Sequence, residues 1–159
     1  MVKFKDWFDN KLMVGMMPDV NMYSQLQKSG VKTIINVSDE WNIQMSLCAE
    51  REGIRYFYFP MNEFSNNYDI GINSIYGALN VLRNCEKSNE KVYIHCHAGS
   101  NRSPTVRNCY HYMRTKFHYK DTPVVLDSDI AKMFGNPDIH QLSEFSNNII
   151  ASKLKSPGE

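Results

Sequence analysis

The feature that most constrains this chain is a cysteine placed between a strand pattern and a helix pattern. A β-branched and aromatic run, Val92 to Ile94, predicts a buried strand. Five residues separate Cys96 from Arg102. Pro104 suits the first turn of a helix, where its missing N–H leaves no backbone bond unmade. Helical spacing continues behind it at Val106, Tyr110, Met113 and Phe117. The segment therefore predicts a strand–loop–helix turn that Cys96 opens.

A turn of this kind has the properties of a site for a doubly charged anion. Successive backbone N–H groups that run into a helix N-terminus direct donors and partial positive charge at one point. Arg102 adds a planar fork that can bind two phosphate oxygens, which a lysine cannot do. The same field favours the thiolate of Cys96, which is the nucleophilic form of cysteine. The Ser103 hydroxyl is placed to bond the sulfur and to ease its departure in a second step.

The residues of this turn resemble a known signature. His95-Cys96 and Arg102-Ser103 stand in the order H-C-x5-R-S, which resembles the signature of the cysteine-dependent protein tyrosine phosphatases. The flanking Ala98-Gly99 and the run to Thr105 are most similar to the dual-specificity branch. The resemblance covers roughly residues 10 to 150, although only the signature is specific. It departs from the family pattern at Thr122 to Val125, where a helix is usual.

Strand patterns alternate with helix patterns along the chain. This alternation predicts an α/β fold with a central, mostly parallel sheet of about four to five strands flanked by helices. Ligands of such sheets bind at the carboxyl ends of the strands, and Cys96 follows one. A length of 159 residues with 42% hydrophobic predicts one domain over residues 1–152. Residues 153–159 are expected to form a flexible tail. The expected strands are 11–15, 31–37, 54–59 and 92–94, and the expected helices precede Gly30, span 42–51, begin after Asp69 and follow Arg102.

The general acid is the point where sequence and family differ. The resemblance implies an aspartate on a loop after the third strand, shortly past a proline. Here the loop follows Pro60, and the matching position holds Glu63. Glutamate has the required chemistry, and the competing interpretation of Glu63 is a solvated loop carboxylate. Asp69 is the alternative acid, and its other interpretation is the N-cap of the next helix.

The remaining loop residues are expected to bind phosphate or to support the loop. His95 is expected to brace the loop by hydrogen bonds, and His97 to lie at the rim of the pocket. Neither histidine has a third ligand at metal-like spacing, so the sequence predicts no metal site, and it implies no cofactor. Tyr58 and Phe64 are candidate aromatic residues of the rim. The predicted phosphate-binding residues are His97, Ala98, Gly99, Ser100, Asn101 and Arg102.

These residues predict a phosphomonoester hydrolase that forms a phosphocysteine intermediate on Cys96. The best substrate is phosphotyrosine in a phosphorylated protein, with phosphoserine or phosphothreonine next. The alternatives are a phosphate-binding module with little turnover, and a phosphatase of a phosphoinositide or an RNA 5′-triphosphate. A net charge of +1 argues against nucleic-acid and membrane partners. The absence of lysine from residues 97–101 argues against a polyanionic lipid headgroup.

The four cysteines lie far apart and form no C-x-x-C pair. This distribution is typical of a reducing compartment, so the sequence predicts a cytoplasmic protein. An ionised Cys96 would be sensitive to oxidation, with Cys48, Cys85 and Cys109 as candidate resolving thiols. The sequence leaves the oligomeric state open.

Overall fold

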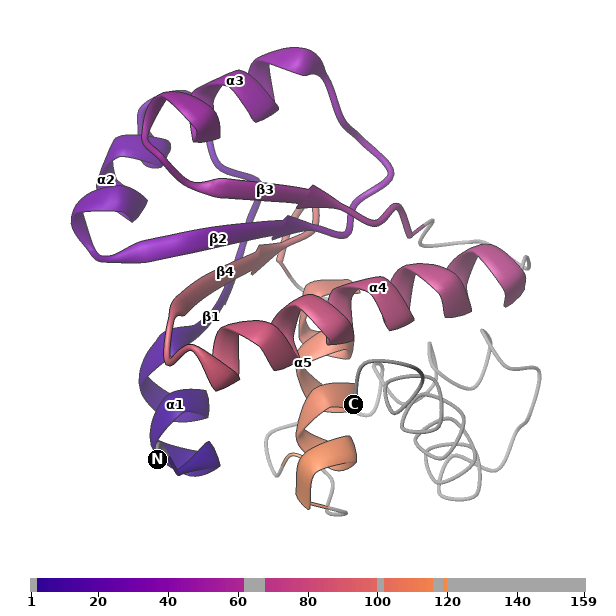
Figure 1. Ribbon diagram of the computed structural model, residues 1–159. Helices are drawn as coiled ribbons and strands as arrows, with labels where there is room; N and C mark the ends of the chain where they lie inside the picture. The colour runs from indigo at the N-terminus through magenta and orange to yellow at the C-terminus, as the bar shows by residue number, and fades with distance from the viewer. Residues whose placement is uncertain (1–2, 62–67, 100–101, 116–118, 120–159) are drawn as a thin grey trace.

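A computed structural model of the protein describes residues 3–61, 68–99, 102–115 and 119. Within these residues the chain forms an α/β fold around a four-stranded sheet in the order β1-β4-β2-β3 (Figure 1). Each neighbouring pair of strands is parallel, which confirms the predicted class of fold. The strands are β1 (Leu12–Gly15), β2 (Val31–Asn36), β3 (Arg55–Tyr58) and β4 (Lys91–His95).

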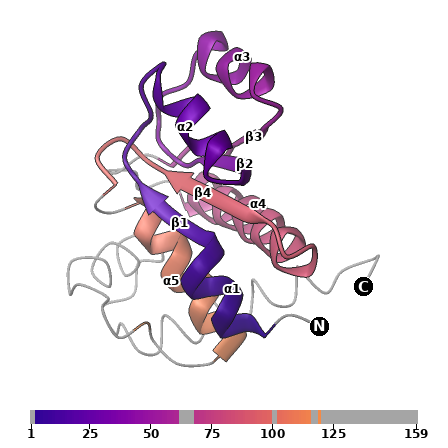
Figure 2. The same ribbon diagram turned by 90° about the vertical axis from the view of Figure 1, so that its left-hand side faces the viewer.

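Helices cover both faces of the sheet. Figure 2 shows α2 and α3 on one face, and α1, α4 and α5 on the other. Each face has its own group of buried apolar side chains: Trp7, Leu79 and Tyr110 lie in the larger group, and Tyr23 and Ala49 in the smaller. The helices are α1 (Phe4–Lys11), α2 (Met22–Lys28), α3 (Ile43–Arg51), α4 (Tyr68–Lys87) and α5 (Arg102–Thr115).

The parallel register brings the carboxyl ends of the four strands to one edge. His95 of β4 is level with Gly15 of β1 and with Asn36 of β2, and Asn36 is level with Tyr58 of β3. The residues that follow each strand therefore meet at this edge, where parallel sheets bind their ligands. Cys96 is one of them.

The position of a strand in the sheet explains its composition. The two central strands, β2 and β4, are almost wholly buried because helices cover both of their faces. Their β-branched runs suit this environment. β3 lies at the edge of the sheet, and its side chains are half-buried or exposed. The aromatic run Tyr56 to Phe59 is therefore less deeply buried than a core strand requires.

Two expectations need correction. The first element expected from the sequence is the strand at 11–15, but α1 precedes β1 and buries Trp7 completely. The N-cap interpretation of Asp69 is also wrong, because α4 begins at Tyr68 and Asp69 is its second residue. An acidic residue favours the positive end of a helix from the first turn as well as from the cap, so the two positions give similar sequence patterns. Among the described helices, none has the length and apolar character needed to cross a membrane.

Candidate active site

The sulfur of Cys96 lies at the carboxyl end of β4 and is held by two neighbouring groups. The backbone N–H of Gly99 donates to Sγ at 3.2 Å, and Oγ of Ser103 lies 3.3 Å from Sγ. The Cys96 residue is only 2% exposed. A thiolate at this position would accept hydrogen bonds from both the amide and the hydroxyl, and such bonds favour the charged form of a group. The structure places the Ser103 hydroxyl next to the Cys96 sulfur, and the catalytic roles of both residues stay predictions.

The backbone of the loop requires glycine at position 99. Gly99 has a φ of +80°, which L-residues with a side chain rarely adopt. A Cβ there would lie 2.7 Å from the carbonyl carbon of Gly15 and 2.8 Å from its oxygen. The N–H of Met17 also donates to the carbonyl of His97 at 3.0 Å. The loop after Cys96 therefore packs directly against the backbone at the end of β1 and just after it.

Arg102 is the first residue of α5, and its guanidinium is oriented from one side. Nη1 donates to Oδ1 of Asp39 at 2.9 Å and to the carbonyl of Met61 at 2.9 Å. These two bonds use both hydrogens of Nη1. Nε and Nη2 have no hydrogen-bond partner among the described residues, and they form the edge that can bind two oxygens of a phosphate. The Arg102 guanidinium also holds the pKa of Asp39 below its ordinary value, mainly through this hydrogen bond.

Asp39 is held in place by the segment that follows β2. The side-chain oxygen of Asn36 accepts from the backbone N–H of Ser38 at 2.9 Å and from its hydroxyl at 2.7 Å. The Asn36 amide donates to the carbonyl of Glu40 at 2.9 Å and to the hydroxyl of Tyr56 at 3.0 Å. Asn36 is fully buried. The Asn36 side chain thus fixes the turn that contains Asp39.

Sequence reasoning missed Asp39. A signal for it exists, because Asp39 lies three residues after the end of a buried central strand, and Cys96 follows the other central strand. Two central strands of a parallel sheet end at the same edge, so polar residues after each are expected to meet there.

His95 is completely buried beside Cys96. Its Nδ1 lies 3.0 Å from the carbonyl oxygen of Cys96, so this nitrogen is assigned as the N–H donor. Nε2 has no hydrogen-bond partner among the described residues. Burial lowers the pKa of His95 to about 4, which keeps the ring neutral near pH 7. The role of His95 in supporting the loop stays a prediction.

His97, by contrast, has 64% of its side chain exposed, and its place at the rim of a phosphate pocket stays a prediction. Its Nδ1 is 4.0 Å from a carboxylate oxygen of Glu40. Ala98 is also exposed.

The two candidate acids follow β3 in the sequence, one before α4 and one at its start. Asp69 belongs to α4, and the position of its side chain lies outside the described part of the structure. The described part of the acid loop ends at Met61, whose carbonyl binds Arg102. Just before it, the carbonyl of Pro60 accepts from Oγ of Ser74 on α4 at 2.5 Å. The start of this loop is therefore bonded to Arg102, the arginine that the sequence predicts to bind phosphate. The predicted residues that lie outside the described part of the chain are Glu63, Phe64, Ser100 and Asn101.

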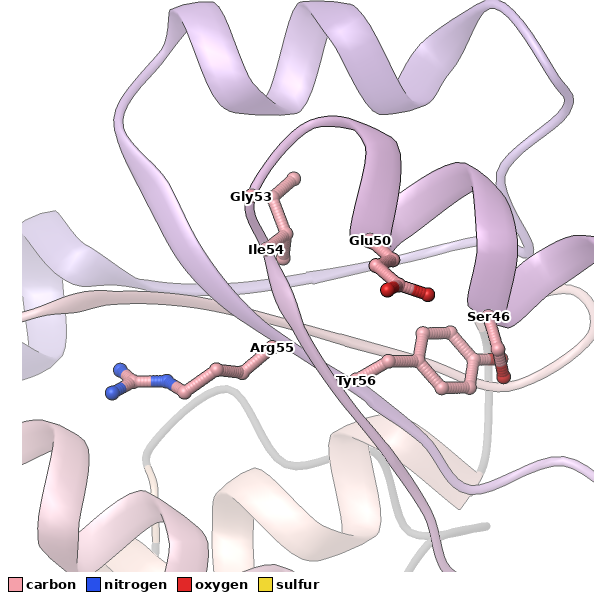
Figure 3. Close-up of a pocket in the computed structure, with 6 residues that line it drawn as sticks. All are labelled: Ser46, Glu50, Gly53, Ile54, Arg55 and Tyr56. Atoms are coloured by element: carbon pink, nitrogen blue, oxygen red, sulfur yellow. The ribbon is translucent and has the colours of Figure 1, made fainter.

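A pocket of about 410 Å³ lies elsewhere, between α3 and the edge strand β3 (Figure 3). The side chain of Arg55 points away from that of Tyr56 in Figure 3, and the Arg55 guanidinium binds Oγ1 of Thr33. The pocket contains none of the predicted catalytic or phosphate-binding residues. In the described part of the chain, no cluster of three or more His, Cys, Asp or Glu could hold a metal ion. Within the described residues Cys48, Cys85 and Cys109 form no disulfide, and their role as resolving thiols stays a prediction.

Comparison with known proteins agrees with this geometry. Residues 12–148 match the family model described as "Dual specificity phosphatase, catalytic domain". A comparison with curated protein sequences found no match.

Several solved structures share the fold. PTPMT1 in complex with PI(5)P aligns with a TM-score of 0.64 and 18% identity, over 92% of this chain and 96% of that chain. Tk-PTP in its active form aligns with a TM-score of 0.61 and 13% identity, over 92% and 95% of the two chains. TpbA of P. aeruginosa aligns with a TM-score of 0.58 and 16% identity, over 91% and 86%. At these identities the likeness shows the fold alone.

Proposed function

The chain belongs to the dual specificity phosphatase family, and we propose that this phosphatase hydrolyses phosphotyrosine in proteins through a phosphocysteine on Cys96. One observation carries the proposal: the Cys96 sulfur lies at the end of a central strand within 3.3 Å of both the Gly99 amide nitrogen and the Ser103 hydroxyl oxygen. The oriented edge of Arg102 supports it, because a bidentate donor suits a phosphate.

The reaction proceeds in two steps. The Cys96 thiolate attacks phosphorus in line with the ester oxygen, so that a sulfur–phosphorus bond forms as the phosphorus–oxygen bond breaks. Glu63 gives its proton to the departing phenolate oxygen, and the loop amides with Arg102 hold the remaining phosphate oxygens. Water then loses a proton to the same carboxylate and attacks phosphorus. The sulfur leaves as a thiolate, which the Ser103 hydroxyl stabilises, and inorganic phosphate is released. Protein groups hold the charge in each step, so we expect full turnover in the presence of EDTA.

A phosphoinositide is the second candidate substrate. PTPMT1 has this fold in a structure with PI(5)P, which is the observation that favours it. The charges beside the catalytic loop favour a substrate with fewer negative groups. Asp39 and Glu40 have side chains that are 58% and 62% exposed at this edge of the sheet, and both carboxylates would repel additional phosphates.

Turnover of a substrate panel tests the proposal. The panel contains one peptide with phosphotyrosine or phosphoserine, vesicles with PI(5)P, and RNA with a 5′-triphosphate. We expect the highest kcat/KM for the phosphotyrosine peptide, loss of turnover in Cys96→Ser, and retention of peptide binding by that variant. Cys109→Ser, on α5, is the matched control and should keep its activity. Binding without turnover by the wild-type protein would favour the phosphate-binding module, and faster turnover of PI(5)P would refute the protein substrate.

A further inference from the structure

Two aromatic side chains form a stack at the edge of the sheet that carries the catalytic loop. The rings of Trp41 and Tyr58 have centroids 6.2 Å apart and planes 21° apart. Tyr58 is the last residue of β3, and Trp41 follows β2 by five residues. Trp41 is 45% exposed, which is unusual for so large an apolar side chain.

Contacts on either side of Trp41 connect the stack to the catalytic groups. Asp39 lies two residues before Trp41 and binds Arg102 at 2.9 Å. Glu40 lies one residue before it, and its carboxylate is 4.0 Å from the ring of His97, the residue after Cys96. Tyr58 is also affected by the charges of Asp39 and Arg102. Burial raises the pKa of Tyr58, the Asp39 charge raises it further, and Arg102 opposes this. The stack therefore borders the mouth of the phosphate site.

The indole of Trp41 is held in a fixed orientation. Its Nε1–H donates to Oγ of Ser46 on α3 at 2.9 Å, so the polar atom of the ring already has a partner. Tyr58 supports the ring on one side. What remains exposed is an apolar aromatic surface whose position is fixed before a substrate arrives. Such a surface loses little entropy when it binds a flat group.

We propose that the Trp41–Tyr58 stack receives the aromatic ring of phosphotyrosine, which makes Trp41 a residue that determines specificity for aryl over alkyl phosphates. This inference rests on the proposed function. A phosphate bound by the catalytic loop and Arg102 directs its ester group out of the site. The ring of phosphotyrosine then lies beside the stack, and the shorter side chain of phosphoserine has no ring to place there. The exposed carboxylates of Asp39 and Glu40 would repel a second phosphate group at this border.

The test compares Trp41→Ala and Trp41→Phe on one peptide that carries phosphotyrosine or phosphoserine. For Trp41→Ala we expect KM for the phosphotyrosine peptide to rise by about three- to tenfold. KM for the phosphoserine peptide should not change. Inhibition by inorganic phosphate, which binds only the catalytic loop and Arg102, should not change either. Trp41→Phe keeps a ring and should restore most of the preference. Leu47→Ala is the matched control, because Leu47 is another exposed apolar residue, on α3.

Fluorescence gives a second readout that does not depend on turnover. The chain has two tryptophans, and Trp7 is fully buried. Binding of the phosphotyrosine peptide to Cys96→Ser should therefore change the emission of Trp41. The change should disappear when Trp41→Phe is added.

Three kinds of result would overturn the inference, and a fourth would refute the proposed function. An equal loss on both peptides, or weaker inhibition by phosphate, would mean that Trp41 only supports the Asp39 turn. Unchanged KM for both peptides would mean that the ring does not meet Trp41. A larger loss on PI(5)P vesicles than on the phosphotyrosine peptide would assign the stack to a lipid headgroup. Absence of wild-type turnover on either peptide would instead refute the proposed function, and the fluorescence of Cys96→Ser would then decide the inference by itself.

Discussion

The most informative single change is Asp39→Asn, because it alters the charge beside Arg102 and keeps the shape of the side chain. In the structure the Asp39 carboxylate accepts from Nη1 of Arg102 at 2.9 Å. The asparagine oxygen can still accept this bond, but without its charge. The guanidinium would then be held less firmly, and its phosphate-binding edge would be less well oriented. We expect both substrate binding and turnover to weaken, since Arg102 holds the phosphate throughout the reaction.

The magnitude follows from the exposure of the two partners. A hydrogen bond to a charged group contributes about 1.5–3 kcal/mol. Arg102 has only 10% of its side chain exposed, but Asp39 has 58%, so water screens the pair. We therefore discount the bond to about 1–1.5 kcal/mol. This corresponds to a fall in kcat/KM of about tenfold.

The assay measures kcat/KM on the phosphotyrosine peptide, together with inhibition by inorganic phosphate. Glu40→Gln is the matched control, because Glu40 is the adjacent carboxylate and is 62% exposed, and it lies 4.0 Å from the ring of His97, whereas Asp39 contacts Arg102. The Asp39 pKa lies below its ordinary value of 3.8. Its ion pair therefore stabilises the fold above that value, and the contribution is lost as the pH falls through the lower, folded-state pKa. Wild-type kinetics in Asp39→Asn, or an equal loss in Glu40→Gln, would refute the role of Asp39.

Three further predictions concern the loop, its neighbour and the acid. Gly99→Ala should lower kcat/KM by at least about tenfold, because the added Cβ meets the Gly15 backbone. Gly53→Ala is its control, because Gly53 also has a positive φ of +70° but has open space around it. This variant should lose only about 1–2 kcal/mol of stability and keep its activity. The free energy of unfolding, measured by denaturant titration, should fall by about 2 kcal/mol between pH 7 and pH 5. In this range unfolded His95 binds a proton, whereas folded His95, with a pKa of about 4, does not. A free energy of unfolding that does not change with pH would contradict this. Glu63→Gln should slow phosphotyrosine by about 10²–10⁴-fold and an activated nitrophenyl phosphate far less. If Asp69→Asn shows that pattern instead, Asp69 is the acid.

The catalytic loop was predictable because its chemistry is local in the sequence. Cys96, Gly99, Arg102 and Ser103 lie within eight positions, and a strand–loop–helix turn brings them together without help from the rest of the chain. The α/β class was predictable for a similar reason, because each strand and most helices show their own period of apolar residues. The order of strands in the sheet was not, because pairing depends on contacts between distant segments.

The residues that orient Arg102 and border the phosphate site were missed because they lie far from Arg102 in the sequence. Asp39 is 63 residues from Arg102 in sequence. Its charge resembles that of any solvated loop residue until the sheet places it beside the arginine. Helix α1 was missed for a different reason. Phe4, Trp7 and Phe8 have helical spacing, but eight residues are too few for the pattern to stand out.

The segment after β2 joins the two halves of substrate recognition. Asp39 acts on the phosphate side through Arg102, and Trp41 stands on the ring side with Tyr58. Both depend on the hydrogen bonds of the buried Asn36, which bind the turn from the inside. A loop held in this way does not need to rearrange when substrate binds, so its residues can select a leaving group at low entropic cost. The catalytic loop is common to phosphate chemistry in general. The choice among phosphates must then come from residues such as these, which the signature does not contain.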